Sequence, residues 1–322
     1  TDFSNVASEA ARLMVVVVLP TPPFWFANAI IFPIFVPKLL KYGAKVHNLY
    51  EKPMKIGGFL VILHPKEYFF MENKKPLILI SNDDGYHSKG LRSLIEMLSG
   101  MAYLLICAPE SARSGYSCAF SAASPLRLKL RRKGEGYEMW SCSGTPVDCV
   151  KIALSQLCGG RTPDMVIGGI NHGDNASVNT HYSGTMGVTM EGCMKFIPSV
   201  AFSLCDHRDD ADFTPMTQLV KDITRKVLEH GLPRYVCLNV NFPVVPDGVK
   251  GVKLCRMAIG DWENEVVKCR HPHDYDYYWM VGEYVNQEPD AEDTDNWALT
   301  HGYASITPTR MDVTAYEVFE KL

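Results

Sequence analysis

From residue 77 onward, short apolar runs alternate with amphipathic stretches. An uninterrupted apolar run predicts a strand that is covered on both faces, because such a strand has no side that faces solvent. Spacings of three and four between apolar residues, as at Leu91, Leu94 and Leu98, predict a helix with one buried side. The segments that predict strands are 77–80, 102–108, 164–169, 198–204 and 237–242, and those that predict helices are 90–98 and 184–194.

Strand, helix and strand repeated at this interval predict an α/β fold, a three-layer αβα Rossmann-like core with a mostly parallel sheet. Residues 126–140 predict a hairpin within this core. A further helix is predicted after Gly144, because Thr145 can cap it, Pro146 suits its first turn and Asp148 complements its N-terminus. The core is expected to span residues 71–243.

Residues 244–322 have a different character. Residues 251–259 predict an extended piece, and residues 265–284, which are rich in aromatic and β-branched residues, predict a long β-hairpin arm. The aromatic residues of this arm offer more apolar surface than a lone hairpin can bury, which favours a contact between copies of the chain. Packing of these residues against their own subunit remains the alternative. The aromatic residues are Tyr275, Tyr277, Tyr278 and Trp279.

The first seventy residues do not match the rest of the chain. No charge occurs between Arg12 and Lys38, a length that suits a membrane span, but five prolines, among them Pro20, Pro22, Pro23 and Pro33, interrupt this stretch. Met71, followed by a polar stretch and the first strand, is typical of a native start. We therefore expect residues 1–70 to be an atypical leader, spurious or dispensable, and expect no membrane partner. A membrane anchor or a targeting leader remains the alternative.

Composition narrows the class of protein. The 322 residues are 47% hydrophobic and carry a formal net charge of -4, which is typical of a globular protein without the broad basic field of a nucleic-acid binder. Ten cysteines are scattered singly, without a CxxC pair. This spacing disfavours a zinc site and favours a reducing compartment, so we expect a cytoplasmic protein.

Candidate chemistry begins where the first core strand ends, at the tetrad Asn82–Gly85. Two adjacent carboxylates, Asp83 and Asp84, are costly at the edge of a sheet unless a cation neutralises them, so they predict a hard divalent metal. Ser114 beside a glycine can approach a metal or a phosphate closely. Because the carboxyl ends of parallel strands meet at one edge of a sheet, Asn171 is expected near the two aspartates.

Small hydroxyl residues at 183–185 open the helix predicted for 184–194, and exposed amides at a helix N-terminus can hold an anion. Each motif has a structural alternative. Asp-Asp-Gly is ordinary turn chemistry, Ser114 can be a loop residue, Asn171 and Asn175 can form Asx-turns, and Ser183 can be a simple helix cap. Their convergence in loops on one side of the predicted sheet favours a functional site.

Six motifs in fixed order, between residue 77 and about residue 308, resemble the SurE family of survival-protein nucleotidases. They are NDDG at 82–85, RSG at 113–115, GTPVDCV at 144–150, GIN at 169–171, YSGT at 182–185 and GYASITP at 302–308.

The resemblance implies a divalent-metal-dependent phosphomonoesterase that hydrolyses nucleoside 5'-monophosphates to nucleoside and phosphate. It implies a catalytic core at 71–243, and an arm within 244–322 that is exchanged in a homodimer or homotetramer. One Mg²⁺ or Mn²⁺ per subunit would be held by Asp83, Asp84, Ser114 and Asn171. Phosphate would be bound by Asn175, Ser183, Gly184 and Thr185. The catalytic residues would be Asp83, Asp84, Asn175 and Ser183.

The chain departs from the family pattern after Asn171, where many bacterial members have small residues and a proline and this chain has His172-Gly173-Asp174. We expect His172 and Asp174 to form a solvated loop pair, and an effect of these two residues on substrate preference or pH response remains the alternative. Because fold and function are separable, a non-catalytic regulatory module that binds a nucleotide or phosphate on the same scaffold remains the alternative to an enzyme.

Overall fold

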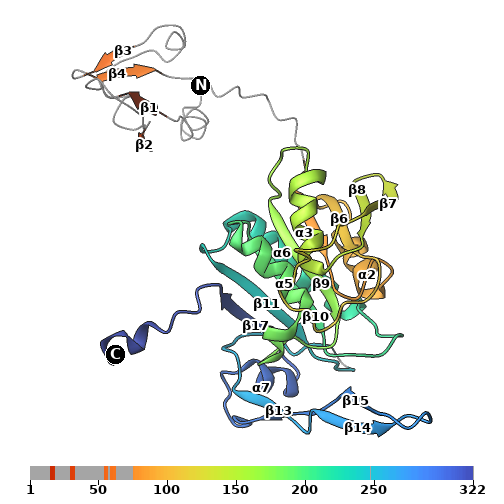
Figure 1. Cartoon of the computed structure of the whole chain (residues 1–322). Helices are drawn as coiled ribbons and strands as arrows, with labels where there is room; N and C mark the ends of the chain where they lie inside the picture. Colours follow the sequence, from red (N-terminus) through yellow and green to blue (C-terminus); the bar gives the residue numbers. More distant parts are fainter. Residues whose placement is uncertain are drawn as a thin grey trace. The chain divides into compact units, whose positions relative to one another are not determined.

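The structure, a computed structural model, describes residues 15–18, 30–32, 54–56, 59–62, 75–246 and 248–321. The chain divides into two units, residues 1–74 and 75–322 (Figure 1). In the first unit, four short strands form an antiparallel sheet in the order β2-β1-β4-β3. These strands are β1 (Val15–Val18), β2 (Ile30–Phe32), β3 (Met54–Ile56) and β4 (Phe59–Ile62). The prediction of a dispensable leader at 1–70 otherwise falls outside the described residues.

A nine-stranded sheet forms the centre of the second unit, in the order β12-β17-β11-β10-β9-β5-β6-β8-β7. The six strands from β11 to β8 run parallel to one another, whereas β17 and β7 are antiparallel to their neighbours β11 and β8. The mostly parallel sheet and the hairpin predicted for 126–140 are thus confirmed. The strands are β5 (Leu77–Ser81), β6 (Tyr103–Pro109), β7 (Leu128–Gly134), β8 (Tyr137–Cys142), β9 (Met165–His172), β10 (Ser199–Leu204), β11 (Val236–Phe242), β12 (Val252–Leu254) and β17 (Ala304–Arg310).

Helices cover both faces of this sheet, which confirms the three-layer αβα fold. Successive side chains of a strand point to opposite faces. Accordingly, Ile78 and Ile80 pack in one buried cluster with residues of α2 (Lys89–Leu98) and α6 (Thr217–His230). Leu77 and Leu79 pack in a second cluster with α3 (Pro146–Ile152) and α5 (Gly184–Met194). The strands therefore show no apolar and polar alternation, because both of their faces are buried.

Local sequence sets the helix ends as predicted. Thr145 caps α3 and forms a capping box with Asp148: the Thr145 hydroxyl accepts from the Asp148 N–H, and the Asp148 carboxylate accepts from the Thr145 N–H. Ser183 caps α5, where its hydroxyl accepts from the N–H of Met186. The smaller helical pieces are η5 (Ala153–Leu157), α4 (Asn179–Tyr182), η6 (Thr214–Met216), α7 (Asp295–Thr300) and η7 (Tyr316–Lys321).

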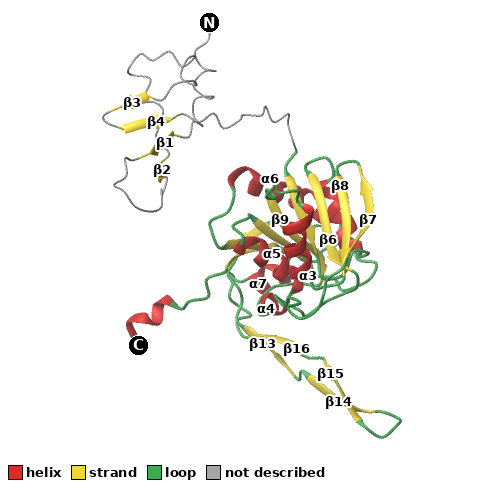
Figure 2. Cartoon of the chain, turned by 45° about the horizontal axis from the view of Figure 1, so that its top comes forward, coloured by secondary structure: helices red, strands yellow, loops and turns green. Residues whose placement is uncertain are grey.

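The C-terminal segment forms the predicted arm and also completes the core. Figure 2 shows a narrow two-stranded ribbon that projects away from the sheet, in which β13 pairs with β16 and β14 with β15. Two aromatic residues of β15 do not pack against their own subunit: Tyr278 and Trp279 are 59% and 61% exposed. After the ribbon, the chain returns through α7 and adds β17 to the sheet beside β11. The ribbon strands are β13 (Gly260–Glu263), β14 (Val266–Arg270), β15 (Asp276–Met280) and β16 (Glu283–Asn286).

A search of the described residues for a helix both long enough and apolar enough to span a bilayer finds none.

Candidate active site

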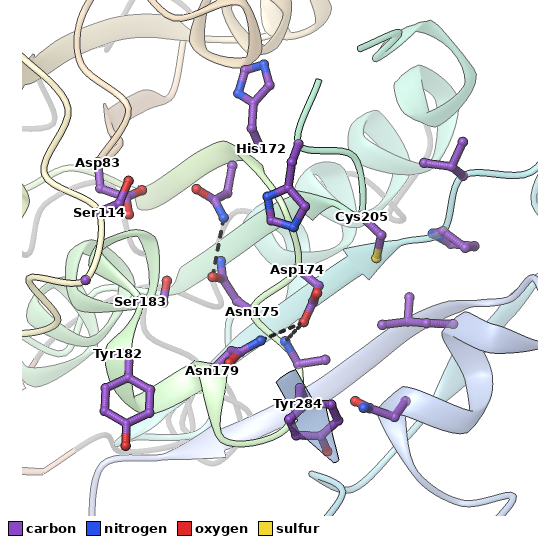
Figure 3. Close-up of a pocket in the computed structure, with 18 of the residues that line it drawn as sticks. Asp83, Ser114, His172, Asp174, Asn175, Asn179, Tyr182, Ser183, Cys205 and Tyr284 are labelled. Carbon is purple, nitrogen blue, oxygen red and sulfur yellow. Dashed lines mark hydrogen bonds between the residues drawn. The ribbon is translucent and has the colours of Figure 1, made fainter. Parts of the chain in front are cut away.

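A cavity of about 690 Å³ opens at the carboxyl ends of the parallel strands. Loops that follow β5, β6, β9, β10 and β11 all contribute to its wall, as expected for a sheet of this kind. Five of the predicted site residues line it together, although as many as 100 positions separate them along the chain. They are Asp83, Ser114, Asn171, Asn175 and Ser183 (Figure 3).

Asp83 is the buried carboxylate of this site, with 4% of its surface exposed. The hydroxyl of Thr185 donates to its Oδ1 at 2.5 Å, and the N–H of Gly184 also donates to it. Burial raises the pKa of Asp83 to about 6, and the charge of Asp84 adds to this rise, while the hydrogen bonds oppose it. The carboxylate thus carries a negative charge that its surroundings compensate only in part.

The N-terminus of α5 approaches Asp83 closely because residue 184 has no side chain. A Cβ at Gly184 would lie 2.7 Å from the Cβ of Asp83. Gly184 and Thr185 therefore contact Asp83 and do not line the cavity wall themselves. The free amides and the dipole of a helix N-terminus favour an anion at this place, so the end of α5 suits a phosphate at Ser183.

Asp84 lies beside the cavity and does not line it. Its Oδ2 lies 3.2 Å from Nδ1 of His172 and 3.4 Å from the backbone nitrogen of the same residue. His172 and Asp174 both line the cavity and are half-buried, so the expectation of a solvated loop pair is wrong. His172 and Asp174 are therefore part of the site.

Asn171 and Asn175 are held by hydrogen bonds that leave particular atoms available. The side-chain N–H groups of Asn171 donate to the carbonyl of Gly173 at 2.9 Å and to Oδ1 of Asn175 at 3.4 Å. Within residues 75–246 and 248–321, the Oδ1 of Asn171 has no hydrogen-bond donor. One side-chain N–H of Asn175 donates to Oγ of Ser203 at 2.6 Å, which leaves its second N–H for a ligand.

Two buried asparagines on β11 support this loop and were not predicted. Oδ1 of Asn241 accepts from the N–H of Asn175 at 2.7 Å, and Nδ2 of Asn239 donates to the carbonyl of Asn175 at 2.7 Å. Asn239 and Asn241 are themselves joined by a hydrogen bond of 2.9 Å. The available signal was their spacing of two in an otherwise apolar strand, which places both on one face of a buried sheet.

The donor atoms suit a hard divalent cation. Asp83, Ser114 and Asn171 offer a carboxylate, a hydroxyl and a carboxamide oxygen in one cavity, and Asp84 lies beside it. Mg²⁺ prefers such oxygen donors, and the only partly compensated charge of Asp83 favours a cation. Among the residues that the structure describes, no three His, Cys, Asp or Glu side chains gather as a metal site.

The opposite wall of the cavity comes from the C-terminal segment, which sequence patterns did not connect with the site. Trp262 of β13, Tyr284 of β16 and Asn296 of α7 line it. The base of the arm, formed by β13 and β16, and the helix α7 that follows the arm thus close this side of the cavity. No sequence motif marks these three residues. The hydrogen bonds of Trp262 to Asn179, of Tyr284 to Ser177 and of Asp295, the neighbour of Asn296, to Ser177 join positions about 80 to 120 apart.

Comparisons with known proteins give a consistent result. The sequence profile of the family "Survival protein SurE" matches residues 78–264. A protein of Phocaeicola vulgatus named 5'-nucleotidase SurE is 52% identical over 252 residues, which cover 78% of this chain and 97% of that protein. A protein of Bacteroides thetaiotaomicron with the same name is 48% identical over 252 residues, covering 78% of this chain and 96% of its own length.

The fold agrees as well. The crystal structure of the SurE protein from Aquifex aeolicus superposes with a TM-score of 0.66 at 34% sequence identity, and the match covers 77% of this chain and 98% of the other. The profile match at 78–264 includes five of the cavity-lining residues predicted from the sequence, Asp83, Ser114, Asn171, Asn175 and Ser183. The chain therefore belongs to the SurE family.

Proposed function

We propose that this protein is a 5'-nucleotidase that hydrolyses nucleoside 5'-monophosphates to nucleoside and phosphate with one Mg²⁺ or Mn²⁺ per subunit. The observation that carries the proposal is the meeting of Asp83, Ser114 and Asn171 with Ser183 in one cavity at the N-terminus of α5. Oxygen donors for a cation and amide donors for a phosphate thus share one space. The names of the relatives from Phocaeicola vulgatus and Bacteroides thetaiotaomicron support this activity.

Each residue has a role that its contacts support. Asp83, Asp84, Ser114 and Asn171 would hold the cation, which when bound neutralises phosphate charge and orients an in-line attack by water. One of Asp83 and Asp84 also orients the attacking water and accepts its proton.

The remaining site residues bind the phosphate. Ser183 and the free side-chain N–H of Asn175 donate hydrogen bonds to its oxygens as charge shifts in the transition state. Gly184 and Thr185 keep Asp83 in place.

Replacement of either aspartate tests the proposal. We expect wild-type protein to release phosphate from AMP, GMP, CMP or UMP in the presence of Mg²⁺ or Mn²⁺, and to lose this activity in EDTA. Asp83→Asn and Asp84→Asn should each abolish turnover while the circular dichroism spectrum and the melting temperature stay near those of wild type. Wild-type turnover in one of these variants would contradict the role of that residue. Nucleotide binding by wild type without phosphate release would favour a regulatory module instead.

A further inference from the structure

The cavity extends beyond the groups that hold metal and phosphate. Figure 3 shows Asp83, Ser114 and Ser183 grouped on one side of the cavity and Asp174 and Tyr284 on the other. A phosphate alone does not need this second side. The second side is built from Asp174 of the loop after β9 and Asn179 of α4, together with the aromatic residues Trp262 and Tyr284 of the arm base.

A chain of hydrogen bonds holds this second side together. Nδ2 of Asn179 donates to Oδ1 of Asp174 at 3.2 Å, and Nε1 of Trp262 donates to Oδ1 of Asn179 at 3.0 Å. One asparagine therefore fixes both a carboxylate and an indole ring on the wall of one cavity. The indole has used its only hydrogen-bond donor, so only its apolar ring surface remains for a ligand.

Tyr284 is fixed in a similar way. Its hydroxyl donates to Oγ of Ser177 at 2.7 Å, and Ser177 in turn donates to the carbonyl of Ala258 at 2.9 Å. The Trp262 and Tyr284 rings lie 6.2 Å apart, centroid to centroid, with their planes inclined by 66°. The two rings form one aromatic wall whose polar edges are already bonded to protein. A flat, apolar ligand surface is the natural partner of such a wall.

One carboxylate oxygen of Asp174 is available to a ligand. The N–H of Ala176 and Nδ2 of Asn179 both bond its Oδ1, at 3.1 and 3.2 Å. In the described part of the chain its Oδ2 accepts no hydrogen bond, and the residue is only half-buried on the cavity wall. An ionised carboxylate only accepts hydrogen bonds, so its partner in the cavity must be a donor such as a hydroxyl. Carboxylates bind the hydroxyls of nucleotide riboses in this way in other α/β folds.

We propose that the second side of the cavity binds the nucleoside half of the substrate: the ring of Trp262, supported by Tyr284, packs against the base, and Asp174 accepts hydrogen bonds from the ribose hydroxyls. This assignment rests on the proposed nucleotidase function and adds to it the residues that recognise a nucleoside. Asp174 lies between the motifs at 169–171 and 182–185 that carry the family resemblance, so the resemblance itself assigns it no role.

Three substrates separate the two contacts. AMP has both the base and the hydroxyls, 2',3'-dideoxyadenosine 5'-monophosphate lacks the hydroxyls, and ribose 5-phosphate lacks the base. We expect Asp174→Asn to lower kcat/KM for AMP on the order of tenfold, mainly through KM, and to leave that for the dideoxy nucleotide unchanged. Trp262→Ala should lower kcat/KM for both nucleotides on the order of tenfold and leave that for ribose 5-phosphate unchanged. Trp262→Phe, which keeps a ring, should retain most of the activity.

Matched controls are an exposed acid and an exposed aromatic residue outside the cavity. Asp209→Asn and Tyr316→Ala should leave kcat/KM for all three substrates at the wild-type value. The assignment would be overturned if Asp174→Asn or Trp262→Ala lowered kcat/KM for all three substrates by the same factor. Such a result would mean that the loop carrying Asn175 had moved. Unchanged kinetics with all three substrates would also overturn it.

Calorimetry with adenosine separates failure of this assignment from failure of the proposed function. Adenosine has no phosphate, so its binding does not require turnover. We expect wild-type protein to bind it and both Asp174→Asn and Trp262→Ala to bind it on the order of tenfold more weakly. Adenosine binding without phosphate release from any substrate would sustain the nucleoside site and refute the nucleotidase. Phosphate release from AMP without measurable adenosine binding at millimolar concentration would support the nucleotidase and refute the nucleoside site.

Discussion

At the scale of single residues, the site depends on how a buried carboxylate is held. Asp83 was predictable from the sequence, because two adjacent carboxylates at the end of a buried strand are costly unless a cation neutralises them. Its partner Thr185, 102 positions away, was predicted only as a phosphate donor, from the family resemblance. The structure shows its hydroxyl bonded to Asp83, and this contact arises only when α5 packs at the end of β5.

Thr185→Val tests this contact. Valine has the shape of threonine without the hydroxyl, so Oδ1 of Asp83 loses its side-chain donor while the buried volume is kept. A hydrogen bond to a charged group is worth roughly 1.5–3 kcal/mol, so we expect kcat/KM for AMP to fall on the order of tenfold or more. Thr185→Ser keeps the hydroxyl and should stay close to wild type. Equal kinetics of the valine and serine variants would show that the hydrogen bond does not matter for turnover.

At the scale of elements, β11 supports the loop after β9 through its two buried asparagines. Asn241→Leu would leave the buried N–H of Asn175 without a partner, and such a group costs about 1–3 kcal/mol. We expect urea denaturation to show a loss of stability of that size, together with lower activity, because Asn175 lines the cavity.

The neighbouring strand offers a control for this variant. Ser305 of β17 lies opposite Asn241 in the sheet, and its buried hydroxyl has no partner among the described residues. Ser305→Ala removes a polar group that makes no hydrogen bond, so stability should stay the same or rise slightly. A loss of stability equal to that of Asn241→Leu would mean that any change at this register is harmful, and the asparagine would then have no special role.

The N-terminus of α3 makes stability depend on pH. Burial raises the pKa of Asp148, but hydrogen bonds from Ser121 and Thr145 outweigh it and hold the pKa below the usual 3.8. A carboxyl with a lower pKa in the folded state stabilises the fold above its unfolded pKa, and this stability is lost as the pH falls through the folded value. Asp148→Ala should therefore cost about 1 kcal/mol of unfolding free energy at pH 7. The difference from wild type should shrink below pH 3.8, and a constant difference across this range would contradict the explanation.

Elements were predictable where their signals are local. The strands of the core follow from apolar runs, and the start of α3 follows from its capping residue Thr145. The start of α5 follows from a hydroxyl residue, Ser183, before a glycine. Helix α6 was not predicted, although Val220, Ile223 and Val227 have helical spacing, because it begins without a side-chain cap and follows a polar turn. The partners of the buried asparagines of β11 and the bond between Trp262 and Asn179 could not be predicted, because each contact joins residues more than 60 positions apart.

At the scale of the whole molecule, the arm leaves apolar surface without a cover in its own subunit. On β15, Tyr278, Trp279 and Met280 are 59%, 61% and 73% exposed. Exposed patches of this kind mark contacts with another protein, and a two-stranded ribbon alone is only marginally stable in water. We therefore predict that the protein forms a homodimer or homotetramer through the arm. The base of the same arm carries Trp262 and Tyr284 of the cavity wall, so assembly and nucleotide binding would depend on one element.

Light scattering coupled to size-exclusion chromatography measures the predicted assembly. Wild-type protein at micromolar concentration should elute with two or four times the mass of one chain, and the combined variant Tyr278→Ser, Trp279→Ser and Met280→Ser should shift to one chain. Leu130 is an exposed apolar residue of β7, the edge strand of the nine-stranded sheet farthest from β12. Leu130→Ser should therefore keep the wild-type mass. Because the arm base holds the aromatic wall, the monomeric variant should also bind adenosine more weakly. A variant that becomes monomeric with unchanged adenosine affinity would show that the base of the arm keeps its place without a partner, and a monomeric wild type would refute assembly through the arm.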